Sequence, residues 1–275
     1  MRWGLEHVRL SFGRRVALDG VTVPVEPSGV TVLVGGDGAG KSSCLKTLVG
    51  LVQPESGSVR RPPKQGIGYV PATAGVYEDL TVQENLDFSA DAYQLPSRQR
   101  GGRQAEILDR IGLAAARHRL GAQLSGGMRR KLAVGLALLH SPEMLVLDEP
   151  TTGVDPVSRA ELWRLIAGAA AAGTAVTVAT TYVNEAARAT SVVLIEAGKV
   201  LASGSPETIL RGVPGALGAA QGTARPTPLS WRRGVSWRVW APAGELPGGV
   251  QQRDPDFEDA VVVAELADER GRQRR

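Results

Sequence analysis

The chain has 275 residues, of which 32 are basic and 28 are acidic, so its formal net charge is +4. One cysteine excludes an intrachain disulfide framework, and three histidines leave little material for a histidine-rich metal centre. No apolar run approaches the roughly 18 residues of a membrane helix, and the opening residues contain no signal-peptide hydrophobic segment, so we expect a soluble chain. Basic and acidic residues are interspersed, and we therefore expect no nucleic-acid partner.

The N-terminal part of the chain predicts short strands and one helix. Apolar and polar side chains alternate over residues 1–30, which is typical of antiparallel strands. Residues 30–35 form a continuous apolar run, which suits a strand buried on both faces of a sheet. Apolar residues recur with helical spacing over residues 44–51, and residues 56–71 predict a further hairpin.

A glycine-rich loop joins the buried strand to the helix and fits the pattern G-x-x-x-x-G-K-[ST] in full. Glycines let backbone N–H groups cradle phosphate oxygens, and the helix that follows points its positive end at them. Lys41 would place its charge between the terminal phosphates, and the Ser42 hydroxyl would ligate magnesium. Asp37 is unusual, because it puts a carboxylate beside this anion site. The predicted nucleotide-binding residues are Gly35, Gly36, Asp37, Gly38, Ala39, Gly40, Lys41, Ser42 and Ser43.

The rest of the chain up to residue 204 alternates predicted helices and strands. Residues 78–140 are rich in helical patterns, and residues 144–149 are a second buried strand. An alanine-rich helix over 158–172 leads to a third buried strand at 174–181, and residues 191–204 read as a hairpin. Strands that alternate with helices predict an α/β fold with a mostly parallel sheet.

Two carboxylates end the second buried strand. Asp148 can hold magnesium, directly or through water, and Glu149 beside it can polarise an attacking water. Together with the phosphate loop, these residues predict a site for phosphoryl chemistry. Lys41 and Glu149 are its predicted catalytic residues, and Ser42 and Asp148 are its predicted metal ligands.

The sequence LSGGM at 124–128, with GGDGAGKSS, LVLDEPTTGVDP and EAGKVLASGSPETIL, resembles the ATP-binding subunits of ABC transporters. The resemblance covers residues 1 to about 211 and is closest to subunits of drug- and polysaccharide-type exporters. It implies a P-loop NTPase core, an antiparallel β subdomain, and a helical signature subdomain at about 78–140. It also implies Mg-ATP hydrolysis and a homo- or heterodimer that encloses two ATP molecules head to tail. A membrane-spanning subunit would hold the dimer on the cytoplasmic face of the cell membrane.

The resemblance also assigns roles to residues outside the phosphate loop. Phe12 would stack on adenine, although ordinary core packing is the alternative. Ser125, Gly126 and Gly127 would contact the terminal phosphate bound by the partner subunit. Asp155 would lie at the dimer interface, or it would only cap the helix that follows.

Two positions depart from the family pattern. Ala72 stands where the family has a glutamine that reaches magnesium and water, and Thr181 stands where the family has a phosphate-contacting histidine. Losing such a donor costs roughly a hundred- to a thousand-fold in rate. We therefore expect a chain that binds Mg-ATP but turns it over slowly, as one half of an asymmetric heterodimer. A fully active homodimer and a catalytically silent regulatory module remain the alternatives.

Residues 212–275 differ in character and predict a small α+β appendage. Glycine and proline are dense up to residue 249, and Trp237 and Val239 alternate with polar residues as in a strand that we expect to begin near Val235. A closing helix resembles the P-x-L-E-D-x-F ending of exporter ATPases, with Phe257 in place of leucine. A small packing module, dimer stabilisation, regulation and contact with a membrane surface are the alternatives for this segment.

Overall fold

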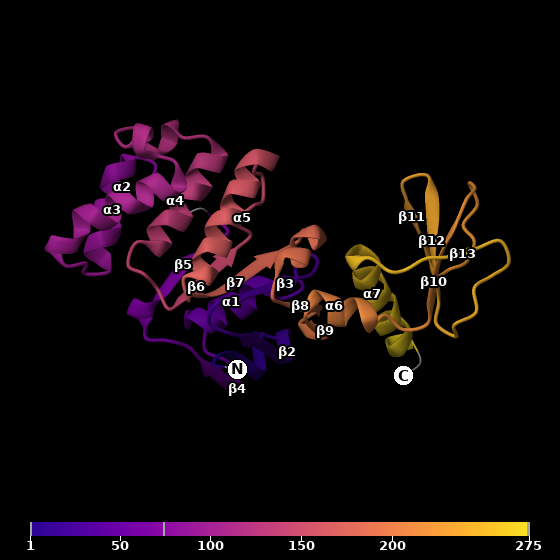
Figure 1. The fold of residues 1–275 in the computed structure, drawn as a ribbon. Coiled ribbons are helices and arrows are strands. Elements are labelled where there is room, and N and C mark those ends of the chain that lie inside the picture. The colour runs from indigo at the N-terminus through magenta and orange to yellow at the C-terminus, as the bar shows by residue number, and fades with distance from the viewer. Residues whose placement is uncertain (1, 74, 274–275) are drawn as a thin grey trace.

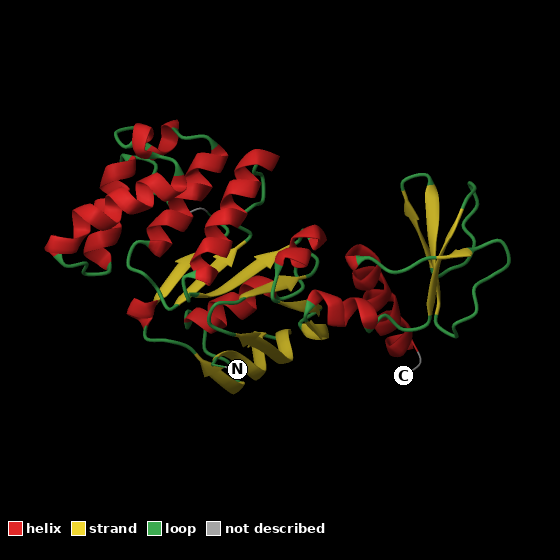
Figure 2. Ribbon diagram, viewed as in Figure 1, coloured by secondary structure: helices red, strands yellow, loops and turns green. Residues whose placement is uncertain are grey.

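The computed structural model describes residues 2–73 and 75–273, and its elements form three sheets with surrounding helices (Figures 1 and 2). The central sheet has the order β5-β6-β7-β3-β8-β9, and all neighbours are parallel except β8 and β9. This parallel sheet flanked by helices confirms the predicted α/β class. Its strands are β3 (Val30–Val34), β5 (Ile67–Val70), β6 (Met144–Asp148), β7 (Ala175–Thr180), β8 (Ser191–Glu196) and β9 (Lys199–Gly204).

The central sheet is buried on both faces, as the apolar runs predict. Alternate side chains of β3 enter two different cores: Val32 packs on one face with Leu162 of α5, and Leu33 packs on the other with Leu45 of α1. Such two-sided burial explains why β3 has no polar face. The helices against this sheet are α1 (Lys41–Val49), α5 (Pro156–Ala171), η4 (Val183–Arg188) and α6 (Pro206–Arg211).

An antiparallel sheet of order β2-β1-β4 covers α1 from the side opposite the central sheet (Figure 1). The prediction of a hairpin over 56–71 is wrong. β4 pairs with β1, whereas β5 joins the central sheet beside β6. Pro62 and Pro63 lie between β4 and β5 and cannot donate backbone hydrogen bonds to a strand ladder. The short helix η1 (Lys64–Gly66) then leads the chain into the central sheet. The antiparallel strands are β1 (Trp3–Phe12), β2 (Arg15–Val25) and β4 (Ser56–Arg60).

A helical layer lies beyond the β5 edge of the central sheet (Figure 2). Its helices fall within residues 78–140, the range that the sequence predicts to be helical. Its first helix begins at a capping box, in which Thr81 accepts from the Glu84 N–H and Glu84 accepts from the Thr81 N–H. No helix among the described residues combines the length and the apolar character needed to cross a bilayer. The elements of this layer are α2 (Val82–Ala92), α3 (Ser97–Ile111), η2 (Ala114–Ala116), η3 (Gly121–Gln123) and α4 (Gly126–Leu138).

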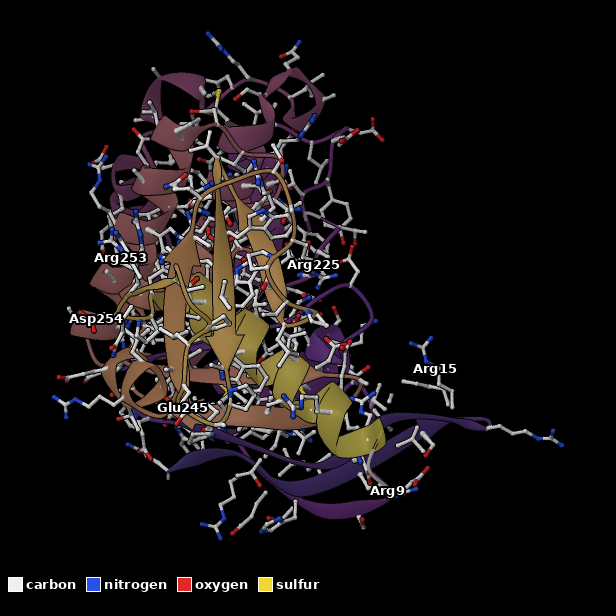
Figure 3. All side chains as sticks on the ribbon, turned by 90° about the vertical axis from the view of Figure 1, so that its right-hand side faces the viewer. Arg9, Arg15, Arg225, Glu245, Arg253 and Asp254 are labelled. Atoms are coloured by element: carbon white, nitrogen blue, oxygen red, sulfur yellow. The ribbon has the colours of Figure 1, made fainter. Side chains whose placement is uncertain are left out.

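The C-terminal residues form a four-stranded sheet of order β11-β12-β10-β13, with α7 between that sheet and the rest of the chain (Figure 1). Val235 lies in the turn before β12 and is 80% exposed, so the strand begins one residue later than the alternation predicts. Figure 3 looks onto this sheet, with Arg225, Glu245 and Arg253 around it. The elements are β10 (Ala216–Ala220), β11 (Ser230–Arg233), β12 (Ser236–Ala241), β13 (Gln251–Gln252) and α7 (Phe257–Gln273).

A buried carboxylate joins this sheet to α7. Asp259 is fully buried and pairs with Arg238 at 3.2 Å and with Arg233 at 3.3 Å. Burial raises the pKa of Asp259, although both guanidinium groups favour its ionised form. Phe257, at the start of α7, is buried in the main core.

Candidate nucleotide site

The glycine loop after β3 has a shape that side chains would prevent. A Cβ on Gly35 would lie 2.1 Å from the Ile195 carbonyl oxygen, and one on Gly40 would lie 2.9 Å from that of Ala17. Gly40 also has a φ of 110°, and its place at the start of α1 leaves the first N–H groups of that helix open toward the loop. The loop is therefore pressed against β2 and β8, and its glycines are required by space as well as by backbone conformation.

Lys41 lies inside the curl of this loop. Its side chain is buried, and its Nζ donates to the carbonyl oxygens of Gly35 at 2.8 Å and of Gly36 at 2.9 Å. Backbone carbonyls carry only partial charge, and no carboxylate among the described residues forms an ion pair with this buried ammonium. A cation held in that way at a helix N-terminus makes a strong site for a phosphate group.

Ser42 and Asp148 bring two oxygen ligands together at the end of β6. The Ser42 hydroxyl donates to Asp148 Oδ1 at 3.1 Å, and Asp148 is 2% exposed. Adjacent ligands of an octahedral Mg²⁺ at about 2.1 Å lie about 3 Å apart, so this pair fits two neighbouring positions around that ion. Burial raises the pKa of Asp148, and the neighbouring Glu149 raises it further while Ser42 lowers it. A bound cation would relieve that burial cost. Among the described residues no cluster of three or more His, Cys, Asp or Glu side chains offers another metal site.

Glu149 is held in an uncommon backbone conformation directly after β6. Its φ is 49°, and its N–H donates to the Ala179 carbonyl of β7 at 2.9 Å. The Thr152 hydroxyl donates to Glu149 Oε2 at 3.0 Å. These two bonds fix a carboxylate in the same cavity as Lys41 and Ser42, where it can accept a proton from a water molecule.

A cavity of about 490 Å³ opens beside the loop. Phe12 lines it and is 53% exposed, so the core-packing alternative for this residue is wrong. The turn at Ala197 and Gly198 closes one side and confirms the predicted β8–β9 hairpin. Six of the nine loop residues named from the sequence line this cavity, namely Asp37, Gly38, Gly40, Lys41, Ser42 and Ser43, whereas Gly35, Gly36 and the buried Ala39 do not.

Arg15 is a lining residue that the sequence analysis missed. It is exposed on β2, and a Cβ on Gly38 would lie 3.6 Å from its guanidinium nitrogen. Figure 3 shows Arg15 on the indigo strands, apart from the C-terminal sheet. Arg15 therefore adds a positive charge to the same cavity mouth as Asp37, and its place three residues after Phe12 was the available signal.

The signature residues begin α4 and lie outside this cavity. Ser125 caps the helix, since its hydroxyl accepts from the Met128 N–H at 3.2 Å. A Cβ on Gly126 would meet nothing within 4 Å, but one on Gly127 would lie 2.6 Å from Ser158 Oγ. Gly126 thus leaves an open helix end, and Gly127 allows α4 to pack closely against α5.

Asp155 is the N-cap of α5. One of its oxygens accepts from the N–H groups of Val157 and Ser158, both at 3.0 Å, and these bonds lower its pKa. Asp155 therefore caps α5, and this cap does not exclude a place at a dimer interface. Val157 next to it is 69% exposed, which leaves a bare apolar side chain on the surface at this end of the helix.

The two positions at which we expect a departure from the family pattern follow the ends of β5 and β7. Ala72 is exposed, and its carbonyl oxygen accepts from Arg130 Nη2 at 2.6 Å. Thr181 is half-buried directly after β7, and the next residue, Tyr182, lies under the guanidinium of Arg159 at 4.7 Å. Ala72 has no polar side chain and Thr181 carries only a hydroxyl, so neither side chain can bring a positive charge to a phosphate. Arg130 is the second residue that the sequence analysis missed.

Comparisons with known proteins agree with this geometry. Residues 18–152 match the family model described as ABC transporter. The probable multidrug ABC transporter ATP-binding protein YbhF of Escherichia coli is 39% identical over 196 residues, which are 68% of this chain and 34% of that protein. The chain thus spans about a third of the length of the YbhF proteins that it matches. Nod factor export ATP-binding protein I of Cupriavidus metallidurans is 33% identical over 217 residues, which are 75% of this chain and 72% of that protein.

Solved structures give the same result for the fold. The structure of an ATP-binding subunit of an ABC transporter superposes with a TM-score of 0.70 and 27% identity, and covers 77% of this chain and 92% of that one. The dimeric structure of a bacterial ABC transporter cassette has a TM-score of 0.66 at 22% identity, and covers 74% of this chain and 98% of that one. The loop geometry, the fold and these relatives together show that the chain belongs to the family of ABC transporter ATP-binding proteins.

Proposed function

We propose that this chain binds Mg-ATP in the cavity beside Lys41 and serves as the ATP-binding subunit of an exporter-type ABC transporter. The observation that carries the proposal is the buried Lys41 ammonium, curled inside its own loop next to the Ser42–Asp148 pair. Residues 1–211 would form the ATP-binding domain and residues 212–275 an accessory segment. Relatives described as multidrug and Nod factor export proteins support the exporter class.

Each residue of the cavity has a role in this proposal. Phe12 stacks on adenine, and the loop residues 35–43 hold the phosphates with their N–H groups and the Lys41 charge. Ser42 and Asp148 hold magnesium, which neutralises phosphate charge when it is bound. Glu149 accepts the proton of the attacking water.

The position of the signature supports a dimer. Because Ser125, Gly126 and Gly127 lie outside the chain's own cavity, they would complete the site of a second subunit placed head to tail. The open Gly126 would let a phosphate approach the N-terminus of α4. Asp155 and the exposed Val157 would lie at the same interface.

An aromatic groove supports a membrane-spanning partner. A cavity of about 290 Å³ lies between β5, α2 and α4, next to the loop that follows Ala72. At its rim Tyr77 and Phe88 are 53% and 49% exposed, with their rings edge to face at 4.8 Å. Two half-exposed aromatic rings beside an apolar cavity suit an apolar helix of a transporter subunit. Such a partner would place the chain at the inner face of the cell membrane.

Slow turnover is the finer part of the proposal. Ala72 has no side-chain donor, and Thr181 offers only a short, uncharged hydroxyl, while Lys41, Asp148 and Glu149 are all in place. The chain would therefore bind Mg-ATP well, hydrolyse it slowly at its own loop, and complete a faster site on a different partner through its signature. A homodimer in which Glu149 suffices, and a silent regulatory module, are the alternatives.

The test is ATP-dependent dimerisation and hydrolysis by the purified chain. We expect Mg-ATP to dimerise the Glu149→Gln variant, as measured by light scattering, and wild-type turnover to be well below the 1–10³ s⁻¹ common for enzymes. Rapid hydrolysis by the chain alone, lost on Glu149→Gln, would overturn the slow-turnover proposal. A chain that binds no Mg-ATP would overturn the subunit proposal itself, whereas a variant that binds Mg-ATP without dimerising would favour a different partner subunit over a homodimer.

A further inference from the structure

Arg130 connects the signature helix α4 with the loop that follows β5, and it interacts with the carboxylates that end β6. It lies on α4, five residues after the Ser125 cap, and its side chain reaches back to the loop that follows β5. Its Nη2 donates to the Ala72 carbonyl oxygen at 2.6 Å, and its Nη1 donates to that of Pro71 at 3.4 Å. Hydrogen bonds from an ionised donor are about twice as strong as neutral ones, so the short bond to Ala72 is the main contact.

The same guanidinium lies in the field of the carboxylates that end β6. Arg130 is half-buried, and this burial lowers its pKa, while Glu149 and Asp148 favour its charged form. Arg130 therefore adds a positive charge close enough to Glu149 and Asp148 to interact with both carboxylates.

The neighbours of Arg130 on α4 point elsewhere. Arg129 pairs with Glu78 at 3.6 Å, and Lys131 pairs with Glu161 at 2.9 Å. Three successive basic residues thus serve three different contacts, and of these three only Arg130 bonds the backbone at Ala72, whereas Arg129 pairs with a side chain at the far end of the same loop. Arg129 is therefore a matched control for the loss of a basic side chain from this turn of the helix.

We propose that Arg130 is a positioning residue for ATP hydrolysis, which clamps the backbone at Ala72 to the signature helix and holds a positive charge beside Glu149. The inference rests on the proposed function, because it concerns the same site. Ala72 offers no polar side chain, so the only polar groups at this position are in the backbone, and Arg130 engages its carbonyl. Any movement of α4 that brings Ser125 and Gly126 to a partner's nucleotide would then carry the loop at Ala72 with it.

The test compares Arg130→Met, Arg130→Lys and Arg129→Met in the full chain. Two measurements are made on each preparation: single-turnover hydrolysis of radiolabelled ATP with protein in excess, and hydrogen exchange of the backbone amides of Ala72 and Thr73, which lie away from the Glu78 partner of Arg129. Mg-ATP affinity is measured in parallel. We expect Arg130→Met to slow the single-turnover rate about tenfold or more and to speed amide exchange in the loop, with Mg-ATP affinity changed less than threefold. Arg130→Lys should recover part of the rate, and Arg129→Met should match wild type in rate and affinity.

The other possible results show whether the inference about Arg130 or the proposed function is wrong. An Arg130→Met chain with wild-type turnover and wild-type exchange overturns the inference. So does a fall in rate that Arg129→Met reproduces, because that result reports general damage to α4. A wild-type chain that binds no Mg-ATP overturns the proposed function instead, whatever the exchange of the loop shows.

Discussion

Replacing Phe12 with alanine tests the adenine-stacking role without disturbing the fold. The Phe12 side chain is 53% exposed at the cavity mouth. Full burial of a phenylalanine contributes about 1.5–3 kcal/mol, so the stability loss should be only about 1 kcal/mol. For a chain of this size such a loss lowers the Tm by about 2–4 °C. Stacking of a base on an aromatic ring contributes about 1–3 kcal/mol, which corresponds to a roughly 5- to 150-fold weaker Kd for ATP.

The assay is titration of the chain with Mg-ATP and, separately, with magnesium and inorganic triphosphate. Because triphosphate has no base, Phe12→Ala should weaken ATP binding and leave triphosphate binding unchanged. Phe88→Ala is the matched control, since Phe88 is 49% exposed on the rim of the aromatic groove. The reasoning is refuted if Phe12→Ala binds ATP as tightly as wild type, or if both ligands weaken together.

Three further predictions concern the signature, the metal ligand and the position after β7. Gly127→Ala should lower the free energy of unfolding by about 1–3 kcal/mol, because the new Cβ would lie 2.6 Å from Ser158 Oγ. Gly126→Ala should keep the wild-type Tm, because its Cβ would meet nothing within 4 Å, and it should reduce ATP-dependent dimerisation. Calorimetry and light scattering measure both effects. Asp148→Asn should raise the Tm of the nucleotide-free chain at pH 7. Because the pKa of Asp148 is raised, its carboxyl group holds a proton more tightly in the folded chain than in the unfolded chain. Ionisation of Asp148 therefore lowers the stability of the folded chain as the pH rises from 3.8 through the folded pKa. The gain should therefore shrink toward pH 4, and equal Tm values at pH 7 would contradict it. Thr181→His should raise the single-turnover rate by about a hundredfold if the missing donor limits hydrolysis, and an unchanged rate would show that it does not.

Much of the fold could be predicted because the buried strands are recognisable in the sequence as short continuous apolar runs. Runs such as residues 32–34 and 144–147 are apolar on both faces, and such runs occur where helices cover both sides of a parallel sheet. The failure at residues 56–71 has a specific cause. The pairing of β4 with β1 and of β5 with β6 joins residues far apart in the sequence, and local alternation carries no information about which distant strand is the partner.

The site could be predicted where chemistry requires particular residue types, and less well where only position matters. The phosphate loop was readable because glycine, lysine and serine are each needed at fixed spacing. Arg15 and Arg130 were missed, because an arginine on a strand or helix surface looks the same in sequence whether it faces solvent or a site. Only the turn of β2 toward Gly38 and the reach of α4 toward Ala72 distinguish these two arginines from their neighbours.

The most direct test of the account is calorimetric titration of the chain with ATP, with and without magnesium, in wild type and in Lys41→Ala. The account predicts that one ATP binds per chain and that magnesium strengthens the binding. It also predicts that Lys41→Ala loses most of this affinity while it stays folded, because the buried ammonium inside the loop curl is the main contact for the phosphates. Equal binding of Mg-ATP by wild type and Lys41→Ala would contradict it.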